Sequence, residues 1–273
     1  SENAAAASLR GEIVVNTDAS IRVLSAAVKA LVRAFQNPTV GVASGRDVSV
    51  DDAAAANRGE SGYVGYEMWV RDLETRLGGI IGASGSFYAV RAAVQRTVLR
   101  EDLARDFASA LIARRLGLRA VSVPDAQCIV PVTPSLRAEA RRKARTMAQG
   151  LETLRYGASL MNPVRHGGFA FKLASHKLAR WLVYLSAPLA VIGVAWLALS
   201  SRVARGLFAA LVLGILLGIA AMRWPAGKRV PLPVAMAGFA LASTVGGLRA
   251  WMLAARRKRL PMWEPTRRAA LPD

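Results

Sequence analysis

Three acidic residues in the first half of the chain stand where they could take part in group-transfer chemistry. The first, Asp18, follows the apolar run at residues 11–15, where a predicted strand gives way to a polar loop. A carboxylate at the end of a strand can hold a divalent cation against a diphosphate, because Mg²⁺ prefers carboxylate and phosphate oxygens. Asp also caps helices, so a catalytic and a purely structural interpretation both remain open for Asp18.

The other two acids, Asp102 and Asp106, lie at the start of a helical pattern over residues 103–116 that ends before Gly117. A carboxylate in the first turn of a helix lies at the positive end of the helix dipole, which keeps it ionised and able to accept a proton from a hydroxyl. Acids at this position also stabilise helices without any chemistry. The residues alone leave both alternatives open.

A basic run at residues 141–145 includes Arg142 and Arg145. These two arginines are three positions apart and therefore share one face of a helix. Guanidinium groups so placed can grip phosphate oxygens in a forked geometry that Lys does not match. On charge alone, a basic face next to a membrane is an equally good interpretation.

Short β-branched runs alternate with helical patterns up to about residue 150, and these elements must position the acids. The pattern predicts strands at 11–15, 40–44, 87–90 and 119–123, helices at 21–36, 67–77 and 103–116, and a Gly- and Ser-rich loop at 78–85. Strands that alternate with helices favour an α/β domain with a largely parallel sheet.

The chain carries a formal net charge of +19 although 53% of its residues are hydrophobic. No acid occurs between Glu152 and Glu264, a stretch with fifteen Lys or Arg residues. These positive charges flank long apolar runs, which is typical of membrane proteins and argues against nucleic acid as a partner. Cys128 is the single cysteine, so a disulfide framework is excluded, and we interpret it as a small buried residue on a strand.

Three uncharged runs in the second half of the chain are long enough to be considered as membrane-spanning helices. A bilayer core takes about 20 apolar residues in a helix, so we predict about three transmembrane helices. The predicted segments are an interfacial amphipathic stretch at 151–180, spans at about 181–199, 206–222 and 231–254, and a basic C-terminal tail at 256–273. Within the interfacial stretch, His166 and His176 are interpreted as packing or interfacial residues.

The orientation of these spans is not decided by the sequence. Three spans after a cytoplasmic domain would put the basic residues 256–259 outside, against the positive-inside tendency. Either the third segment is re-entrant or interfacial, or the charge rule is overridden.

Motifs in a fixed order carry a resemblance to a known family. They are GEIVVNTDAS at 11–20, GASGSFYAVR at 82–91, EDLARDFASALIARRLGLRAVSVPDA at 101–126, RRKARTMAQG at 141–150, SHKLARWL at 175–182 and WEPT at 263–266. This succession resembles the membrane-bound, processive-type family 2 glycosyltransferases, over nearly the whole chain. The resemblance implies a partial GT-A domain, the fold that binds nucleotide-diphospho-sugars, at residues 1–150. It also implies that the first βα units of that domain precede Ser1, so that donor binding is impaired in the chain as given.

The resemblance assigns roles to the candidate acids. Asp18 matches the first acid of the family's DxD motif, which implies that it binds the donor diphosphate through Mg²⁺ or Mn²⁺. Ser20 stands where the second acid is usual, which weakens the expected metal coordination. Asp106, eleven residues before Gly117, matches the general base, and Asp102 is the second choice.

Two further groups of residues follow from the same resemblance. Arg142 and Arg145 match the arginines of a QxxRW-like motif near the diphosphate, although Thr146 stands in place of the Trp and the Gln is absent. The loop that lines the acceptor site is matched by Gly82, Ala83, Ser84 and Gly85.

The function implied is that of an inverting glycosyltransferase with a nucleotide-sugar donor and a glycan or lipid acceptor. Its expected location is the inner (plasma) membrane, with several spans and a cytoplasmic catalytic domain. The alternative is a non-catalytic membrane scaffold or partner-binding protein with a degenerate glycosyltransferase fold. Ser20 and Thr146 favour that alternative, whereas Asp18 and Asp106 disfavour it.

Overall fold

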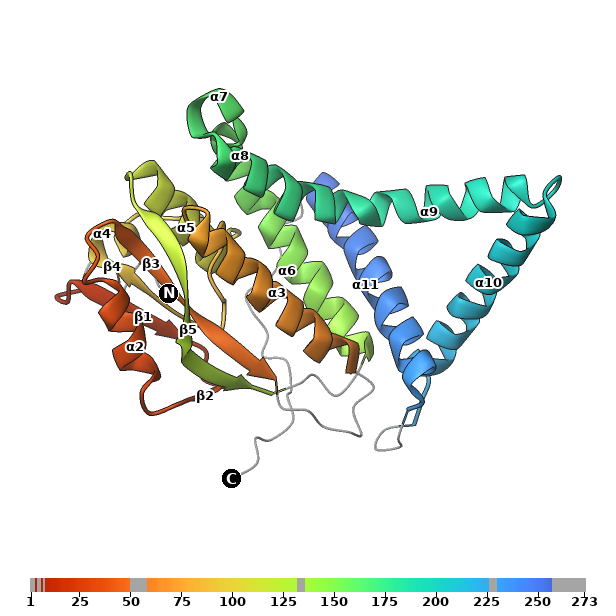
Figure 1. The fold of residues 1–273 in the computed structure, drawn as a ribbon, viewed down its shortest axis with the longest axis horizontal. Coiled ribbons are helices and arrows are strands. Elements are labelled where there is room, and N and C mark those ends of the chain that lie inside the picture. The colour runs from red at the N-terminus through yellow and green to blue at the C-terminus, as the bar shows by residue number, and fades with distance from the viewer. Residues whose placement is uncertain are drawn as a thin grey trace.

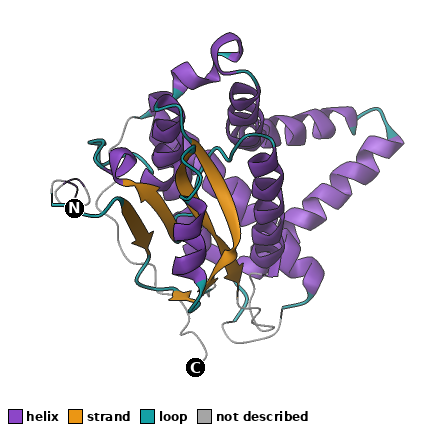
Figure 2. Cartoon of the chain, turned by 60° about the vertical axis from the view of Figure 1, so that its left-hand side comes forward, coloured by secondary structure: helices purple, strands orange, loops and turns teal. Residues whose placement is uncertain are grey.

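A mixed sheet with helices on both faces forms one end of the molecule, and long apolar helices form the other (Figure 1, Figure 2). This computed structural model describes residues 3, 6, 8–49, 58–131, 136–225 and 230–256. The strands are β1 (Ile13–Thr17), β2 (Arg22–Val23), β3 (Val40–Ser49), β4 (Phe87–Arg91) and β5 (Arg119–Val130). Their order across the sheet is β1-β4-β3-β5-β2.

The direction of the strands differs from the sequence-based expectation. Only β3 and β5 run parallel, whereas β4 runs antiparallel to both of its neighbours, β1 and β3, and β2 runs antiparallel to β5. The prediction of a largely parallel sheet is therefore wrong. An apolar run reveals that a segment is a strand, but its direction depends on which distant segment it pairs with.

Two elements also differ in extent. The predicted helix at 21–36 is shortened to α2 (Ala27–Ala34), because Arg22 and Val23 pair with the end of β5 instead. The strand expected to stop before Pro124 continues to Val130. Its register against β3 shifts between Ser122 and Gln127, so Pro124, which has no N–H to donate, lies at an irregularity of the ladder.

The sheet buries apolar side chains on both of its faces. On one face, Leu31 and Phe35 of α2 pack with Phe87 and Cys128. Cys128 is fully buried on β5, which confirms the sequence-based interpretation. The opposite face is covered by α3 (Arg58–Arg76), the short α4 (Ala92–Gln95) and α5 (Arg105–Arg115). This packing on both faces holds the ends of the strands and the start of α5 in place.

The chain then passes through several helical pieces. They are α6 (Leu136–Tyr156), η1 (Ala158–Met161), α7 (Pro163–His166), α8 (Gly168–Lys172) and the π-helical η2 (Leu173–Ala179). Because α6 runs across position 150, no element ends at the expected domain boundary. Within the stretch at 151–180, the end of α6 is followed by the short η1 and α7, and from Gly168 the helix continues without a break through α8, η2 and α9 to Leu197. Beyond Arg256, the predicted basic tail lies outside the described residues.

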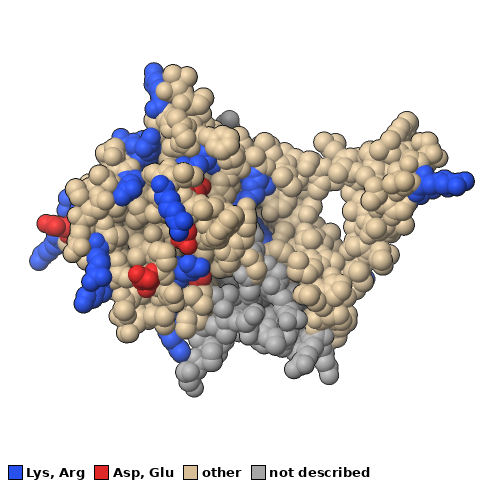
Figure 3. Space-filling view, in the orientation of Figure 1, with Lys and Arg blue, Asp and Glu red and all other residues tan. Residues whose placement is uncertain are grey.

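Three apolar helices follow, α9 (Arg180–Leu197), α10 (Arg202–Met222) and α11 (Leu232–Ala255). By length and composition, the helical segments Gly168–Leu197, Arg202–Met222 and Leu232–Ala255 could each cross a membrane. Large apolar side chains such as Leu189 and Ile192 are about two-thirds exposed. Figure 3 shows Lys and Arg spread over the sheet-bearing end, while the projecting helices carry charge mainly at their far corner. These features are those of a membrane protein.

Candidate active site

A short loop at residues 82–86 lies at the centre of the candidate site. Ser84 is held on both sides: its N–H donates to Ser44 Oγ at 2.8 Å, and its hydroxyl contacts both carboxylate oxygens of Asp47 at 2.7 and 2.8 Å. The same hydroxyl accepts a hydrogen bond from the N–H of Ser86 at 3.2 Å. The loop is thus fixed in one conformation by β3, which supplies both Ser44 and Asp47.

Asp106 lies against this loop from the first turn of α5. The start of α5 is positioned by α6, because the N–H of Ala104 donates to Thr153 Oγ1 at 2.9 Å. A Cβ atom at Gly85 would stand 3.2 Å from Asp106 Oδ2, and the N–H of Ala83 donates to the backbone oxygen of Asp106 at 3.4 Å. The structure therefore brings together the predicted base and the predicted acceptor loop.

The surroundings of Asp106 alter its affinity for protons. Burial raises the pKa of Asp106 above its ordinary value, although the N–H of Phe107 and the positive charges of Lys177 and Arg71 act in the opposite direction. A carboxylate whose pKa is raised holds a proton more tightly, and it is a better general base than a solvated Asp.

Asp18 lies on the other side of the loop, directly after β1. Its N–H donates to the backbone oxygen of Ser86 at 2.9 Å. Burial, Asp47 and Asp18 together raise the pKa of the Cys128 thiol, whose sulfur lies 3.4 Å from Asp47 Oδ1. The two carboxylates thus act on a common buried thiol at one edge of the sheet. Ser20 follows two positions later and is exposed.

These side chains fit a hard cation that takes most of its ligands from elsewhere. Across the described ranges, no group of three or more His, Cys, Asp or Glu side chains gathers in a way that could hold a metal ion. Mg²⁺ commonly binds through only one or two carboxylates, with substrate phosphates and water completing its shell. Asp18, with Asp47 nearby and the Ser20 hydroxyl in the same loop, meets that requirement.

Asp102, the second choice for the base, has a different environment. Its carboxylate is gripped by the guanidinium of Arg100, with Arg100 Nε 2.9 Å from Asp102 Oδ1. Arg100 also approaches Glu152 on α6 at 3.8 Å. Asp102 thus belongs to an ion-paired turn that precedes α5, whereas Asp106 faces the loop.

Of the two α6 arginines that were predicted to lie near the diphosphate, one is already bound to a carboxylate of the same helix. Arg142 donates through Nε and an Nη atom to the two carboxylate oxygens of Glu139, each at 2.8 Å. Glu139 is completely buried, so this forked pair within α6 neutralises a buried carboxylate and occupies the Arg142 guanidinium. Arg145 lies one turn further along the same helix.

A buried ionic cluster next to the loop was missed by the sequence reasoning. On α3, Glu67 pairs with Arg180 at 2.6 Å, and Glu74 Oε1 lies 2.8 Å from His176 Nδ1. Arg71, between them, approaches Ser44 Oγ and the backbone oxygen of Ala83, each at 3.4 Å. We call these five residues, together with Lys177, the ionic cluster. Glu67, Arg71 and Glu74 recur at helical spacing, which could have signalled a shared face, but nothing local identifies their partners.

Lys177 connects the ionic cluster to the loop. Its Nζ would stand 3.8 Å from a Cβ atom at Gly82, and it lies 5.4 Å from the centre of the Phe107 ring. Lys177 and His176 belong to the π-helical η2, a geometry often found at functional sites. His176 is therefore an ion-pair residue of the site rather than a residue of the membrane surface.

The ionic cluster keeps Glu67 charged. Burial alone would raise the pKa of Glu67, but neighbouring groups outweigh it and hold that pKa far below its ordinary value. The groups responsible are, in decreasing order, His176, Lys177, Arg180 and Arg71. The predicted acceptor loop is thus backed by a fixed set of charges.

The arrangement of sheet, loop and acids is that of a GT-A domain. A mannosyltransferase from Pyrobaculum calidifontis, solved in complex with GDP-Man and Mn²⁺, superposes with a TM-score of 0.66 at 20% sequence identity. The match covers 94% of this chain and 66% of that one, so this chain spans just under two-thirds of the mannosyltransferase. Among curated proteins, none matches the sequence.

The family is shown by the sequence itself. The sequence model of the protein family "Glycosyl transferase family group 2" matches residues 13–224, which is most of the chain. The chain belongs to this family. The matched region runs from β1 to the end of α10 and so includes the loop, Asp106 and the ionic cluster.

Proposed function

We propose that this protein is an inverting glycosyltransferase that moves a sugar from a nucleotide-sugar donor to a glycan or lipid acceptor at a membrane. The observation that supports the proposal is that the Asp106 carboxylate faces Gly85 of the loop, so that Asp106 would serve as a proton acceptor beside the proposed acceptor site. The mannosyltransferase of similar fold is bound to GDP-Man, which supports a nucleotide-sugar as the class of donor.

In the proposed reaction, Asp106 takes the proton from an acceptor hydroxyl held at the loop. The oxygen so released forms a bond to the anomeric carbon of the donor sugar from the face opposite the diphosphate. The bond between that carbon and the diphosphate oxygen breaks, so the nucleoside diphosphate leaves and the configuration inverts. General-base assistance of this kind contributes about 10²- to 10⁴-fold to a rate.

Donor binding is assigned to the edge of the sheet at Asp18. Asp18, with Ser20 and Asp47 nearby, would hold Mg²⁺ or Mn²⁺, and the ion when bound would neutralise charge on the diphosphate. Arg142 and Arg145 are proposed to approach the diphosphate. For Arg142 this requires release from Glu139, its forked partner.

Lys177 and Arg71 are proposed as positioning residues. They hold positive charge beside Asp106 and the loop, which favours the ionised, proton-accepting form of Asp106.

The decisive experiment compares the full gene product with its Asp106→Asn variant in detergent, using GDP-mannose and UDP-glucose with Mn²⁺ as probes. We expect donor turnover to fall by at least about 100-fold. The melting temperature should not fall, because burial disfavours the charge that is removed. Normal turnover in Asp106→Asn would overturn the assignment of the base.

A non-catalytic scaffold is the second candidate, favoured by Ser20 and by the engagement of Arg142 with Glu139. The two functions differ in donor binding. A transferase should gain thermal stability from GDP or UDP in the presence of Mn²⁺, and that gain should be lost in Asp18→Asn. A scaffold should show no such gain with either nucleotide.

A further inference from the structure

The third apolar helix, α11, is packed along a highly charged helix of the catalytic end. Contacts join α6 and α11 at the middle and at the C-terminal end of α11: Lys143 Nζ donates to Ser243 Oγ at 2.8 Å, and Arg155 approaches the backbone oxygen of Ala254 at 3.4 Å. The two helices also approach closely at Gly246, where a Cβ atom would stand 2.9 Å from the backbone oxygen of Ala140. Small residues of α11 are what allow this approach, namely Gly238, Ala242, Gly246, Ala250 and Ala254.

This packing argues against a membrane-spanning α11. The helix α6 carries six Lys or Arg and two Glu residues, four of the basic ones at positions 141–145. If α11 crossed the bilayer, α6 would be drawn into the hydrocarbon beside it. A charged side chain at the centre of a bilayer is strongly disfavoured, and α6 carries eight of them. This favours a position of α11 on the same side of the membrane as the sheet.

The other two apolar helices rise from α11 and meet at a distance from it. Figure 1 shows α9, α10 and α11 as the three sides of an open triangle, and Figure 3 shows the opening. Trp251 Nε1 donates to the backbone oxygen of Trp181 at 2.9 Å, which ties the start of α9 to the C-terminal half of α11. A Cβ atom at Gly238 would stand 2.5 Å from that of Ala221, which ties the end of α10 to the N-terminal half.

The two rising helices have the length that a bilayer requires. At about 1.5 Å per residue, the 18 residues of α9 and the 21 of α10 extend about 27 and 32 Å, close to the 30 Å core. A hairpin of two spans returns the chain to its starting side. Arg256, at the end of α11, then lies on the side of the catalytic end, as the positive-inside tendency requires.

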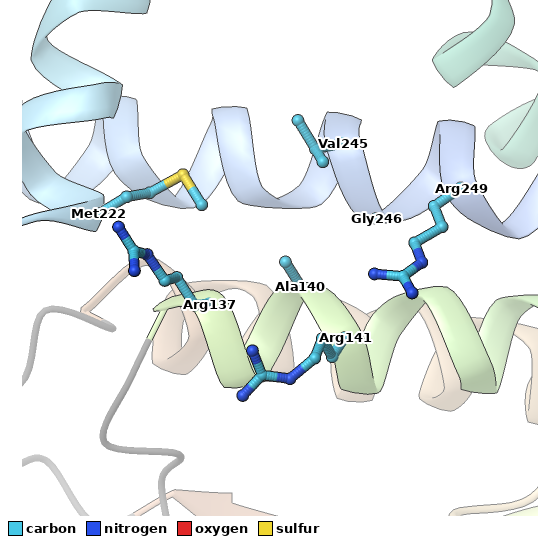
Figure 4. Close-up of a pocket in the computed structure, with 7 residues that line it drawn as sticks. All are labelled: Arg137, Ala140, Arg141, Met222, Val245, Gly246 and Arg249. Atoms are coloured by element: carbon cyan, nitrogen blue, oxygen red, sulfur yellow. The ribbon is translucent and has the colours of Figure 1, made fainter.

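A cavity of about 210 Å³ opens along the seam between α6 and α11. Its basic lining consists of Arg137 and Arg141 of α6 and Arg249 of α11. Figure 4 shows Arg137 and Arg249 reaching between the two helices and Arg141 lying over α6. Met222 and Val245 add apolar surface. Within the part of the chain that the structure describes, none of the three arginines forms an ion pair or hydrogen bond. Three uncompensated guanidinium groups at one cavity favour a bound anion.

We propose that α11 lies in the head-group layer on the side of the catalytic end, and that this cavity binds the phosphate of an anionic phospholipid. An amphiphile fits better than a free anion because the arginines adjoin apolar surface: Val245 is 46% exposed on the same flank of α11. If only α9 and α10 cross the bilayer, the line of contact between α6 and α11 lies at the level of the head groups. This inference does not depend on the transfer activity.

The membrane arrangement is tested by labelling with a membrane-impermeant maleimide. Single cysteines are introduced in a Cys128→Ser background at three exposed positions: Val98→Cys in the catalytic end, Ser200→Cys at the apex of the hairpin and Arg256→Cys after α11. In sealed vesicles of one orientation, the reagent should label Val98→Cys and Arg256→Cys together and Ser200→Cys only in the opposite orientation. Labelling of Arg256→Cys together with Ser200→Cys would mean three spans and overturn the arrangement.

The lipid site is tested by titration with dioctanoyl-phosphatidylglycerol in detergent, with dioctanoyl-phosphatidylcholine and inorganic phosphate as the other arms. Replacing Arg137, Arg141 and Arg249 by Gln removes the charge-assisted hydrogen bonds to the phosphate, so phosphatidylglycerol binding should weaken by at least about tenfold. The matched control replaces three exposed arginines of the sheet-bearing end, Arg22, Arg33 and Arg76, by Gln. An equal loss in the control would mean that only general charge attracts the lipid, and equal binding of inorganic phosphate would assign the cavity to a free anion. Either result overturns the lipid site without bearing on catalysis.

Discussion

The carboxylate of Asp106 faces Gly85, with Asp106 Oδ2 only 3.2 Å from the position that a Cβ atom would take at Gly85. A methyl group there would push against the carboxylate that is proposed to accept the proton. We expect Gly85→Ala to lower turnover by about tenfold or more, because small displacements of a reacting group strongly reduce rates. Steady-state kinetics with a nucleotide-sugar measures the effect.

The control for Gly85→Ala is Gly65→Ala on α3, where an added Cβ meets nothing within 4 Å. It should leave turnover unchanged. Equal turnover in both variants would show that the contact at Gly85 has no bearing on catalysis.

The positive charge of Lys177 lowers the pKa of Asp106, against the dominant effect of burial, which raises it. Removing that charge in Lys177→Met should therefore raise the pKa further. Since the base acts only when deprotonated, the acid limb of the pH profile of kcat/KM should move to higher pH. In Lys177→Arg, which keeps the charge, the acid limb should lie at the same pH as in the parent protein. An acid limb that does not shift in Lys177→Met would contradict the proposed role.

Glu67 should be important for stability because it neutralises buried cations. Glu67→Gln would leave Arg180 and Arg71 without their carboxylate, and breaking a buried ion pair costs about 3–5 kcal/mol. We expect a clearly lower melting temperature than in Glu101→Gln, which alters an exposed acid. A variant as stable as the control would mean that solvent already compensates these charges.

The stability that Glu67 contributes should depend on pH. The pKa of Glu67 is lowered on folding, so its contribution to stability is fully present above the unfolded-state value and is lost only as the pH falls toward the folded-state value. The difference in melting temperature between Glu67→Gln and the parent should therefore persist at neutral pH and shrink in strong acid. A difference that grows in acid would contradict the assignment.

The contact between α9 and α11 depends on a glycine. A Cβ atom at Gly247 would stand 2.3 Å from Cγ of Tyr184, so Gly247→Ala should force the two helices apart at a cost of about 1–3 kcal/mol. Thermal unfolding followed by tryptophan fluorescence measures the loss. Removing the ring in the double variant with Tyr184→Ala should recover part of it, whereas Gly193→Ala on α9, where the space is open, should be neutral.

Local patterns in the sequence were enough to locate most elements. The strand before Asp18, the helix after Asp106 and the three apolar helices all depend on the spacing of side chains within one segment, and each was found where expected or within a few residues. The motif order also pointed to the family that the residues from 13 to 224 match. These elements can be predicted because the periodicity of a helix or strand depends only on residues that are close together in the sequence.

The pairing of segments that are far apart in the sequence could not be predicted from such local patterns. The antiparallel direction of β4 depends on β1 and β3, both distant in sequence. The ionic cluster joins Glu67 to Arg180 over 113 positions, and no local feature of either residue selects the other. Such partners are decided by the packing of whole elements, so single-segment patterns cannot identify them.

By itself, then, the sequence determined the kinds of element, the candidate acids and the membrane character, because these follow from local periodicity, apolar length and motif order. Only the tertiary structure decided that Asp106 rather than Asp102 faces the loop at Gly85, and that Lys177 lies beside them. It also decided that α11 packs along α6, and on this contact our two-span arrangement depends. The physical reason is common to these cases: each is set by burial and charge pairing between distant segments, which arise only when the chain is folded.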